Sequence, residues 1–225
     1  MKKSILSLVT LTLLTLSLTA PAWSAIIALS NLPATDVNSL GIANNQWVGR
    51  EFTTGSSSPS WNLDHVVLNA YNSGNTSDFT VKLYSNTGGK PGSLLSTLTG
   101  PPPSWSTANY STFTDPLTTL LNQNTSYWIV ASSFAAPGDG FMWASNSKGN
   151  NSFTAGLADW SYASGGAYSG NSGSSWNIWS GDRNPLMEVD VVGGGPATVP
   201  EPSTYALFSL GFAGLALWKR RQKKA

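Results

Sequence analysis

The residues of this chain that could do acid–base chemistry are one histidine and a set of carboxylates. His65 is the single histidine among 225 residues, and it directly follows Asp64. A histidine beside a carboxylate could act as a general base. Neighbours in a regular strand point to opposite faces, however, so we predict that Asp64 and His65 do not form a dyad. We expect His65 to be a solvent-facing or capped strand residue.

Paired carboxylates are the second chemistry to consider. Of the eleven Asp and Glu residues, all but Glu201 lie between Ile26 and Val199. Two such groups could hydrolyse a glycosidic bond, but no spacing in the sequence marks a pair. We therefore predict no catalytic residue, and a glycan-active enzyme that uses paired carboxylates stays open as the alternative.

The sequence gives little support for a metal site, a catalytic nucleophile or a bound cofactor. The chain has no cysteine, which excludes disulfides, thiolate metal sites and a cysteine nucleophile. No nucleophile elbow, zinc-ligand pair or phosphate-binding loop occurs. Asp139, Asp159 and Asp182 lie in Gly/Asn-rich stretches, where they could ligate a structural calcium ion or cap turns. We predict no cofactor and no metal site.

Tryptophans are the remaining candidates for binding. Eight lie between positions 47 and 179, and Trp160, Trp176 and Trp179 fall in a Gly/Ser/Asn-rich stretch. Indole faces stack on sugar rings, so these three are the predicted glycan-binding residues. Trp128 stands in the hydrophobic run 127–132, and we expect it to belong to the core.

The charge balance argues against nucleic acid as a partner. Seven of the twelve basic residues lie at the two chain ends, so residues 26–199 hold five basic and ten acidic side chains. This region therefore has a formal charge of about −5 and no basic patch. About 170 residues suffice for one core.

The elements that must position these residues are predicted to be strands. Alternating polar and apolar residues favour strands near positions 48–54, 63–71, 78–84, 127–132 and 186–191. Turn residues separate the strands at 72–75, 86–89, 122–124 and 137–140, and three prolines at 101–103 suit an edge or a loop. The pattern predicts one all-β, jelly-roll-like sandwich over residues 25–195, with strands from about Gln46 to Val192.

Both ends read as targeting segments outside this domain. Residues 1–24 have a basic start, an apolar stretch and small residues, which is typical of a signal peptide handled by the Sec translocon and signal peptidase. Cleavage after Ser24 is favoured over cleavage after Ala22, and an uncleaved helix is the alternative.

The last 30 residues, 196–225, combine three pieces in a fixed order. Val199, Pro200, Glu201, Pro202 and Ser203 form a rigid, proline-containing handle. The uncharged run 205–218 follows, and Lys219, Arg220 and Arg221 begin a basic tail at 219–224 that would stay on the cytoplasmic side. Fourteen helical residues cover about 21 Å against a hydrocarbon core of about 30 Å. We therefore expect a transmembrane helix that holds the protein temporarily.

This order resembles the PEP-CTERM sorting signal of Gram-negative bacteria. The resemblance covers the Pro200–Glu201–Pro202 triplet, the apolar span and the basic end. It implies that an exosortase reads the signal, that the protein passes transiently through the inner membrane, and that its host makes exopolysaccharide. An ordinary C-terminal anchor preceded by a proline-rich linker is the alternative.

The region between the ends also resembles a known domain. Phe52–Thr53–Thr54–Gly55, the run 79–84 with Gly88–Gly89–Lys90–Pro91, and the run 120–130 are similar to the choice-of-anchor R domain, over roughly residues 47–192. This likeness implies a bacterial surface domain and carries no catalytic residue.

Two main classes of function follow from these observations. We expect a non-catalytic protein of the cell surface or extracellular matrix that associates with exopolysaccharide. A secreted glycan-active enzyme is the alternative, and a module that recognises protein partners is a third possibility.

Overall fold

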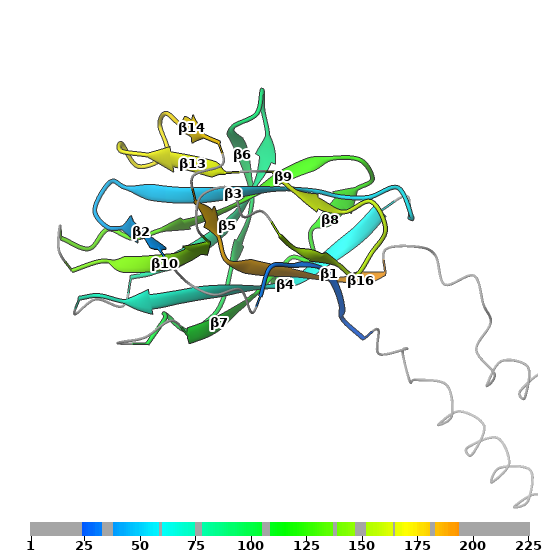
Figure 1. The fold of residues 1–225 in the computed structure, drawn as a ribbon, viewed down its shortest axis with the longest axis horizontal. Coiled ribbons are helices and arrows are strands. Elements are labelled where there is room, and N and C mark those ends of the chain that lie inside the picture. Colours follow the sequence, from blue (N-terminus) through cyan, green and yellow to red (C-terminus); the bar gives the residue numbers. More distant parts are fainter. Residues whose placement is uncertain are drawn as a thin grey trace, which may run out of the picture.

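Every regular element that the structure describes is a β-strand. The computed structural model describes residues 24–32, 38–58, 60–74, 78–104, 109–136, 139–146, 152–163, 165–180 and 183–193. Within these ranges sixteen strands form two antiparallel sheets, which pack face to face as a sandwich (Figure 1). The predicted all-β sandwich is confirmed.

The larger sheet has nine strands and contains the long central strand of the domain. Its strands are β1 (Ile26–Ser30), β2 (Asn38–Ile42), β4 (Ser60–Asn72), β7 (Asn109–Thr114), β8 (Leu120–Asn122), β10 (Phe141–Asn146), β11 (Thr154–Ala155), β15 (Asn184–Pro185) and β16 (Met187–Gly193). The 13-residue β4 pairs with β16 and β10, and also with β7 and β8.

The smaller sheet has seven strands and lies against the first. Its strands are β3 (Trp47–Thr53), β5 (Thr80–Asn86), β6 (Pro91–Leu98), β9 (Ser126–Ser132), β12 (Ser161–Tyr162), β13 (Gly166–Ser169) and β14 (Asn177–Trp179). The order β14–β13–β3–β9–β5–β6 places β3 and β9 at its centre. The β13–β14 hairpin is the yellow ribbon at the upper left of Figure 1.

The core forms between the sheets from one side of each alternating strand. Val81 and Leu83 of β5 are fully buried, as are Val66 and Leu68 of β4. Arg50 of β3 shares this inward side with Val48 and Phe52. The strand period of two thus separates buried from outward residues in both sheets.

Arg50 is a buried cation in this core. Its Nη1 donates a hydrogen bond to the Pro185 carbonyl of the opposite sheet, and its guanidinium lies 3.9 Å from the centroid of the Tyr162 ring. Burial lowers the pKa of Arg50 to about 10, partly offset by the nearby Tyr162. The residue ties the two sheets together and offers no surface for a ligand.

The five strands expected from alternation are present, while others were missed. Strands β3, β4, β5, β9 and β16 match the predicted runs. The predicted start near Gln46 is wrong, because β1 and β2 precede it and pair with β16 and β10 respectively. Both are only five residues long; β1 has adjacent apolar residues at its start, and β2 alternates over too few residues to stand out.

The two described ends of the domain lie on the same side of the sandwich. Strands β1 and β16 are antiparallel neighbours, with Ile26 opposite Val191. Figure 1 shows β1 and β16 ending together at the right. The first and last described strands are therefore neighbours in the same sheet.

Candidate functional site

The structure separates the predicted glycan-binding tryptophans. Trp160 is 2% exposed and stacks on Phe52, with 6.1 Å between ring centroids and 7° between ring planes. The prediction that Trp160 is available at the surface is wrong, because its loop turns the indole into the main core although polar residues flank it. Trp176 and Trp179 are each half-buried.

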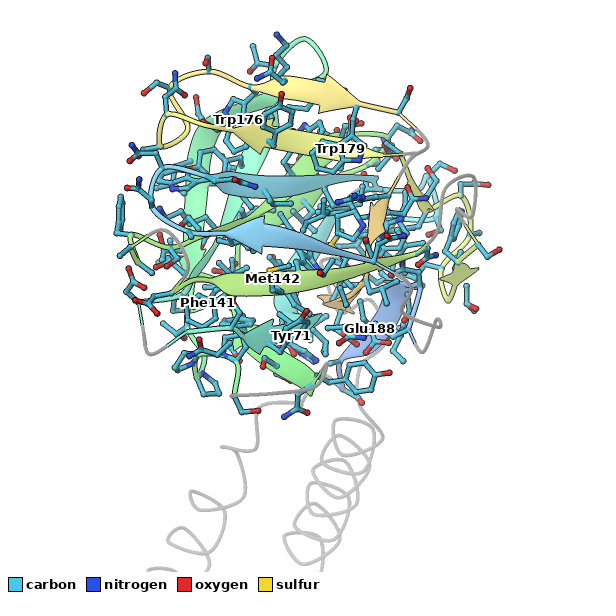
Figure 2. All side chains as sticks on the ribbon, turned by 60° about the vertical axis from the view of Figure 1, so that its left-hand side comes forward. Tyr71, Phe141, Met142, Trp176, Trp179 and Glu188 are labelled. Carbon is cyan, nitrogen blue, oxygen red and sulfur yellow. The ribbon has the colours of Figure 1, made fainter. Side chains whose placement is uncertain are left out.

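Trp176 and Trp179 lie at the same hairpin but contact different clusters. Trp179 packs against the main core and donates its Nε1–H to the Arg183 carbonyl at 2.8 Å. Trp176 packs against a second apolar cluster, on the outward side of the smaller sheet. Figure 2 shows both at the yellow β13–β14 hairpin. The three predicted residues therefore do not form one site.

The second cluster is built by the outward positions of three adjacent strands. Trp47 of β3 and Trp128 and Val130 of β9 are buried in it together with Ala167 of β13. Tyr84 of β5 is opposite Trp128 and partly covers the cluster. We call this surface the outer aromatic face, and it comprises Trp47, Lys82, Tyr84, Trp128 and Trp176.

A glycine makes room for the indoles of the outer aromatic face. Gly49 of β3 is opposite Val130, and a Cβ on it would lie 3.3 Å from a Val130 methyl and 3.4 Å from the Trp128 ring. A side chain here would therefore crowd Trp128. Glycine at this position leaves room for the Trp128 ring beside the β3 backbone.

Polar side chains border the outer aromatic face in a fixed arrangement. The Lys82 ammonium lies 4.3 Å from the centroid of a Trp47 ring, a cation–π contact. Trp128 Nε1 donates to Asn86 Oδ1 at 3.3 Å, and Asn86 Nδ2 donates to Glu51 Oε1 at 3.1 Å. Partial burial lowers the pKa of Lys82 and raises that of Tyr84.

The second candidate site is a histidine held between two aspartates. His65 Nδ1 lies 2.6 Å from Asp64 Oδ2, and His65 Nε2 lies 3.3 Å from Asp190 Oδ2. The prediction that Asp64 and His65 cannot interact is therefore wrong. Asp190 comes from β16, 125 positions along the chain from His65, and sequence spacing could not have placed it there.

A β-bulge explains why neighbouring residues meet. His65 pairs with Asp190 but Leu63 pairs with Val191, so Asp64 is the extra residue of β4. In a bulge two residues of one strand oppose one residue of its partner, and the normal alternation is interrupted. In the sequence the only sign of the bulge is a change of spacing. The apolar Leu63 and Val66, both buried, are separated by two polar residues instead of one.

The electrostatics of this cluster favour a neutral acid. Burial raises the pKa of Asp190 to about 6, with His65 acting to lower it and the Glu188 and Asp64 carboxylates acting to raise it further. Asp190 is also hydrogen-bonded to Glu188. Carboxyl groups in direct contact cannot flank a glycosidic bond, which requires a separation of about 5–9.5 Å.

The structure offers little for a metal ion. In the nine described ranges no group of three His, Cys, Asp or Glu side chains is arranged to hold one. Asp159 has a positive φ of 65° and accepts a hydrogen bond from the Ser56 hydroxyl at 2.9 Å, as expected of a turn residue. Asp182 lies outside the described residues.

The predicted sorting residues lie outside the part of the chain that the structure describes. They are Val199, Pro200, Glu201, Pro202 and Ser203, the basic Lys219, Arg220 and Arg221, and the expected transmembrane run 205–218. Of the described residues, none belongs to a helix long and apolar enough to cross a membrane.

Comparison with known families identifies the C-terminal segment. Residues 198–221 match the PEP-CTERM protein-sorting motif, so the chain carries this motif, as its sequence predicted. The motif implies export and processing by an exosortase. No curated protein was found to match the chain. The likeness of the sandwich to the choice-of-anchor R domain stays a prediction.

Proposed function

We propose that this chain is a non-catalytic protein of the cell surface or extracellular matrix, sorted by an exosortase and associated with exopolysaccharide. The observation that carries the proposal is the PEP-CTERM motif at residues 198–221. On this proposal the Sec translocon exports the chain, signal peptidase removes residues 1–24, and the run 205–218 holds the protein briefly in the inner membrane of a Gram-negative cell.

The experiment that tests the sorting part replaces Pro200, Glu201 and Pro202 by alanine. Cell fractionation should find the variant trapped in the inner membrane, while the unchanged protein reaches the surface or the medium. Deleting the exosortase gene of the same host should give the same distribution. If the triple variant reaches the surface normally, the triplet is only a linker and not a sorting motif.

Association with exopolysaccharide is supported by the outer aromatic face. Tyr84 and Trp176 are partly exposed rings over a buried aromatic cluster, and such rings stack on sugars with roughly 1 kcal/mol each. The proposal predicts that Trp176→Ala lowers retention of the protein on the host's own matrix. Trp160→Ala is the comparison variant. Because the Trp160 ring is buried in the core, its removal should affect folding and not a surface contact.

The enzyme alternative has one observation in its favour, the raised pKa of Asp190 beside Glu188 and Asp64. A neutral carboxylic acid near pH 6 could protonate a leaving group. The contact between Asp190 and Glu188 speaks against it, because carboxyl groups in direct contact cannot flank a glycosidic bond. Release of reducing sugar from the host's matrix by the full chain, abolished in Asp190→Asn, would favour the enzyme over the matrix protein.

A further inference from the structure

The outer aromatic face lies outside the core that forms between the two sheets. The two sheets pack through the main core, which contains Val48 and Phe52 of β3. Trp47 and Trp128 point the other way, where a strand of a sandwich ordinarily carries polar side chains. Tyr84 and Trp176 are the partly exposed rings of this cluster, and exposed apolar surface can mark a binding site.

Lys82 gives this face a cation without a carboxylate partner. Among the described residues, the ion pairs within 4.0 Å involve His65 alone, and Lys82 instead lies over the Trp47 ring. Glu51, the carboxylate nearest in the sheet pattern, accepts a hydrogen bond from Asn86. The ammonium is therefore placed for an anionic group that comes from outside the chain.

The charges of the two outward faces differ. The larger sheet carries Asp64, Glu188 and Asp190 on its outward side, whereas the outward side of the smaller sheet carries Lys82 and one carboxylate, Glu51. In Figure 2, Trp176 lies at the top of the molecule and Glu188 toward the bottom. The outward side of the larger sheet is therefore the more negative of the two, and Lys82 is the position on the smaller sheet that favours an anionic polymer.

We propose that the outer aromatic face binds an acidic polysaccharide, with pyranose rings against Tyr84 and Trp176 and a uronate carboxylate at Lys82. This inference rests on the proposed association with exopolysaccharide and names its chemical class. The Trp128–Asn86–Glu51 chain of hydrogen bonds fixes the floor of the site.

The size and charge of the face favour a sugar chain over other polymers. A stable protein interface buries about 800 Å² on each partner. Two half-exposed rings, Tyr84 and Trp176, offer too little apolar surface for an interface of that size. Nucleic acid is held through many phosphate contacts, which one lysine on a domain of about −5 charge does not supply.

The test compares one polymer with and without its charge. Full-length protein in mild detergent is titrated with polygalacturonate and with the same polymer after methyl esterification of its carboxylates. We expect the acidic form to bind at least about fivefold more tightly, with an affinity that falls as salt is added. Lys82→Gln should weaken binding of the acidic form about tenfold and abolish the difference between the two polymers.

Matched variants separate this site from general effects. Lys90→Gln removes a cation from the turn of the same hairpin and should leave binding unchanged. Tyr84→Ala should weaken binding of both polymers, while Tyr84→Phe keeps the ring and should bind as well as the unchanged protein. Urea midpoints confirm that each variant is folded.

Three results overturn the inference. They are equal binding of the two polymers, no effect of Lys82→Gln, and tighter binding of a single-stranded oligonucleotide at the same face. Binding of both polymers without a charge preference, with normal retention on the host's matrix, leaves the exopolysaccharide association standing. If the unchanged protein is not retained on the host's matrix, the proposed function itself is overturned.

Discussion

At the scale of single residues, burial decides which side chains can do chemistry. Asp190 is 4% exposed, and two bulges flank it, since β1 also shifts register between Ile27 and Leu29. The site therefore combines a desolvated acid with His65 and two further carboxylates. Burying the Asp190 carboxylate costs free energy when it is ionised, so its effect on the stability of the protein depends on pH.

The first prediction concerns Asp190→Asn. The folded-state pKa is about 6 and the ordinary value is 3.8, so between these pH values the folded protein binds more protons than the unfolded chain. The contribution of Asp190 to stability is therefore complete below about pH 4 and is lost as pH rises through 6. Relative to the unchanged protein, Asp190→Asn should gain about 1–2 kcal/mol between pH 4 and pH 7, allowing for solvent screening.

Urea unfolding of both proteins at the two pH values measures this gain. Asp159→Asn is the control, because Asp159 is exposed and at a turn, where asparagine also accepts a positive φ. An equal stability difference at pH 4 and pH 7 would show that Asp190 does not titrate in this range.

The pKa of Asp115 is shifted in the opposite direction to that of Asp190. It is 3% exposed and accepts hydrogen bonds from the Ser96 hydroxyl and from the backbone N–H groups of Leu117 and Thr119. Burial alone would raise its pKa, but these hydrogen bonds outweigh burial and lower it. The stability it supplies is present above the unfolded pKa and is lost as pH falls through the folded value.

We predict that Asp115→Ala destabilises the protein by about 2–4 kcal/mol at pH 7, because two backbone donors lose their acceptor in the turn after β7. Chemical denaturation gives the value. Asp115→Asn keeps one acceptor oxygen and should lose less. A loss below about 0.5 kcal/mol for the alanine variant would mean that water replaces the carboxylate.

At the scale of elements, the sequence predicts strands where alternation is regular and fails where it is not. The β5 run was clear because Val81 and Leu83 alternate with Lys82 and Tyr84. The Asp64–His65 contact could not be foreseen, since a bulge depends on pairing with a strand 125 positions away. Likewise, nothing in the sequence shows that Trp47, Trp128 and Tyr84 share one surface, because their strands become neighbours only in the sheet.

The β5–β6 turn is an element that the sequence did mark. Gly88 and Gly89 have φ values of 60° and 76°, and Thr87 and Lys90 exchange backbone hydrogen bonds of 2.9 and 3.3 Å. This is the two-residue hairpin geometry that favours Asn–Gly and Gly–Gly sequences. No atom lies within 4 Å of a Cβ added at Gly88, so only the backbone conformation resists substitution.

Accordingly, Gly88→Val should cost about 1–2 kcal/mol of stability, and Gly88→Asn should cost less than about 0.5 kcal/mol. Thermal or urea unfolding distinguishes them. Gly170→Ala is the matched control at an equally open position without a positive φ, and it should be neutral. Equal effects of valine and asparagine at Gly88 would argue against a left-handed turn.

At the scale of the whole molecule, the sandwich is closed by its first and last strands. Ala28 and Leu29 of β1 are fully buried, and β1 pairs with β16 along four residue positions. Asn31 continues this link, because its Oδ1 accepts from the Met187 N–H at 2.7 Å and its Nδ2 donates to the Pro185 carbonyl at 3.3 Å. The residues just after the expected signal peptide are thus part of the core.

The last prediction follows from this closure. A fragment of residues 25–195 should fold with a β-type circular dichroism spectrum and a single urea transition, because every described strand lies within it. A fragment of residues 32–195 should not fold, since losing buried Leu29 costs about 2–5 kcal/mol and the β1–β16 hydrogen bonds and Asn31 add to this. That total approaches the whole stability of an ordinary domain. A cooperative transition with an unchanged midpoint in the shorter fragment would show that β1 is dispensable and that the domain begins near Gln46, as the alternation alone suggested.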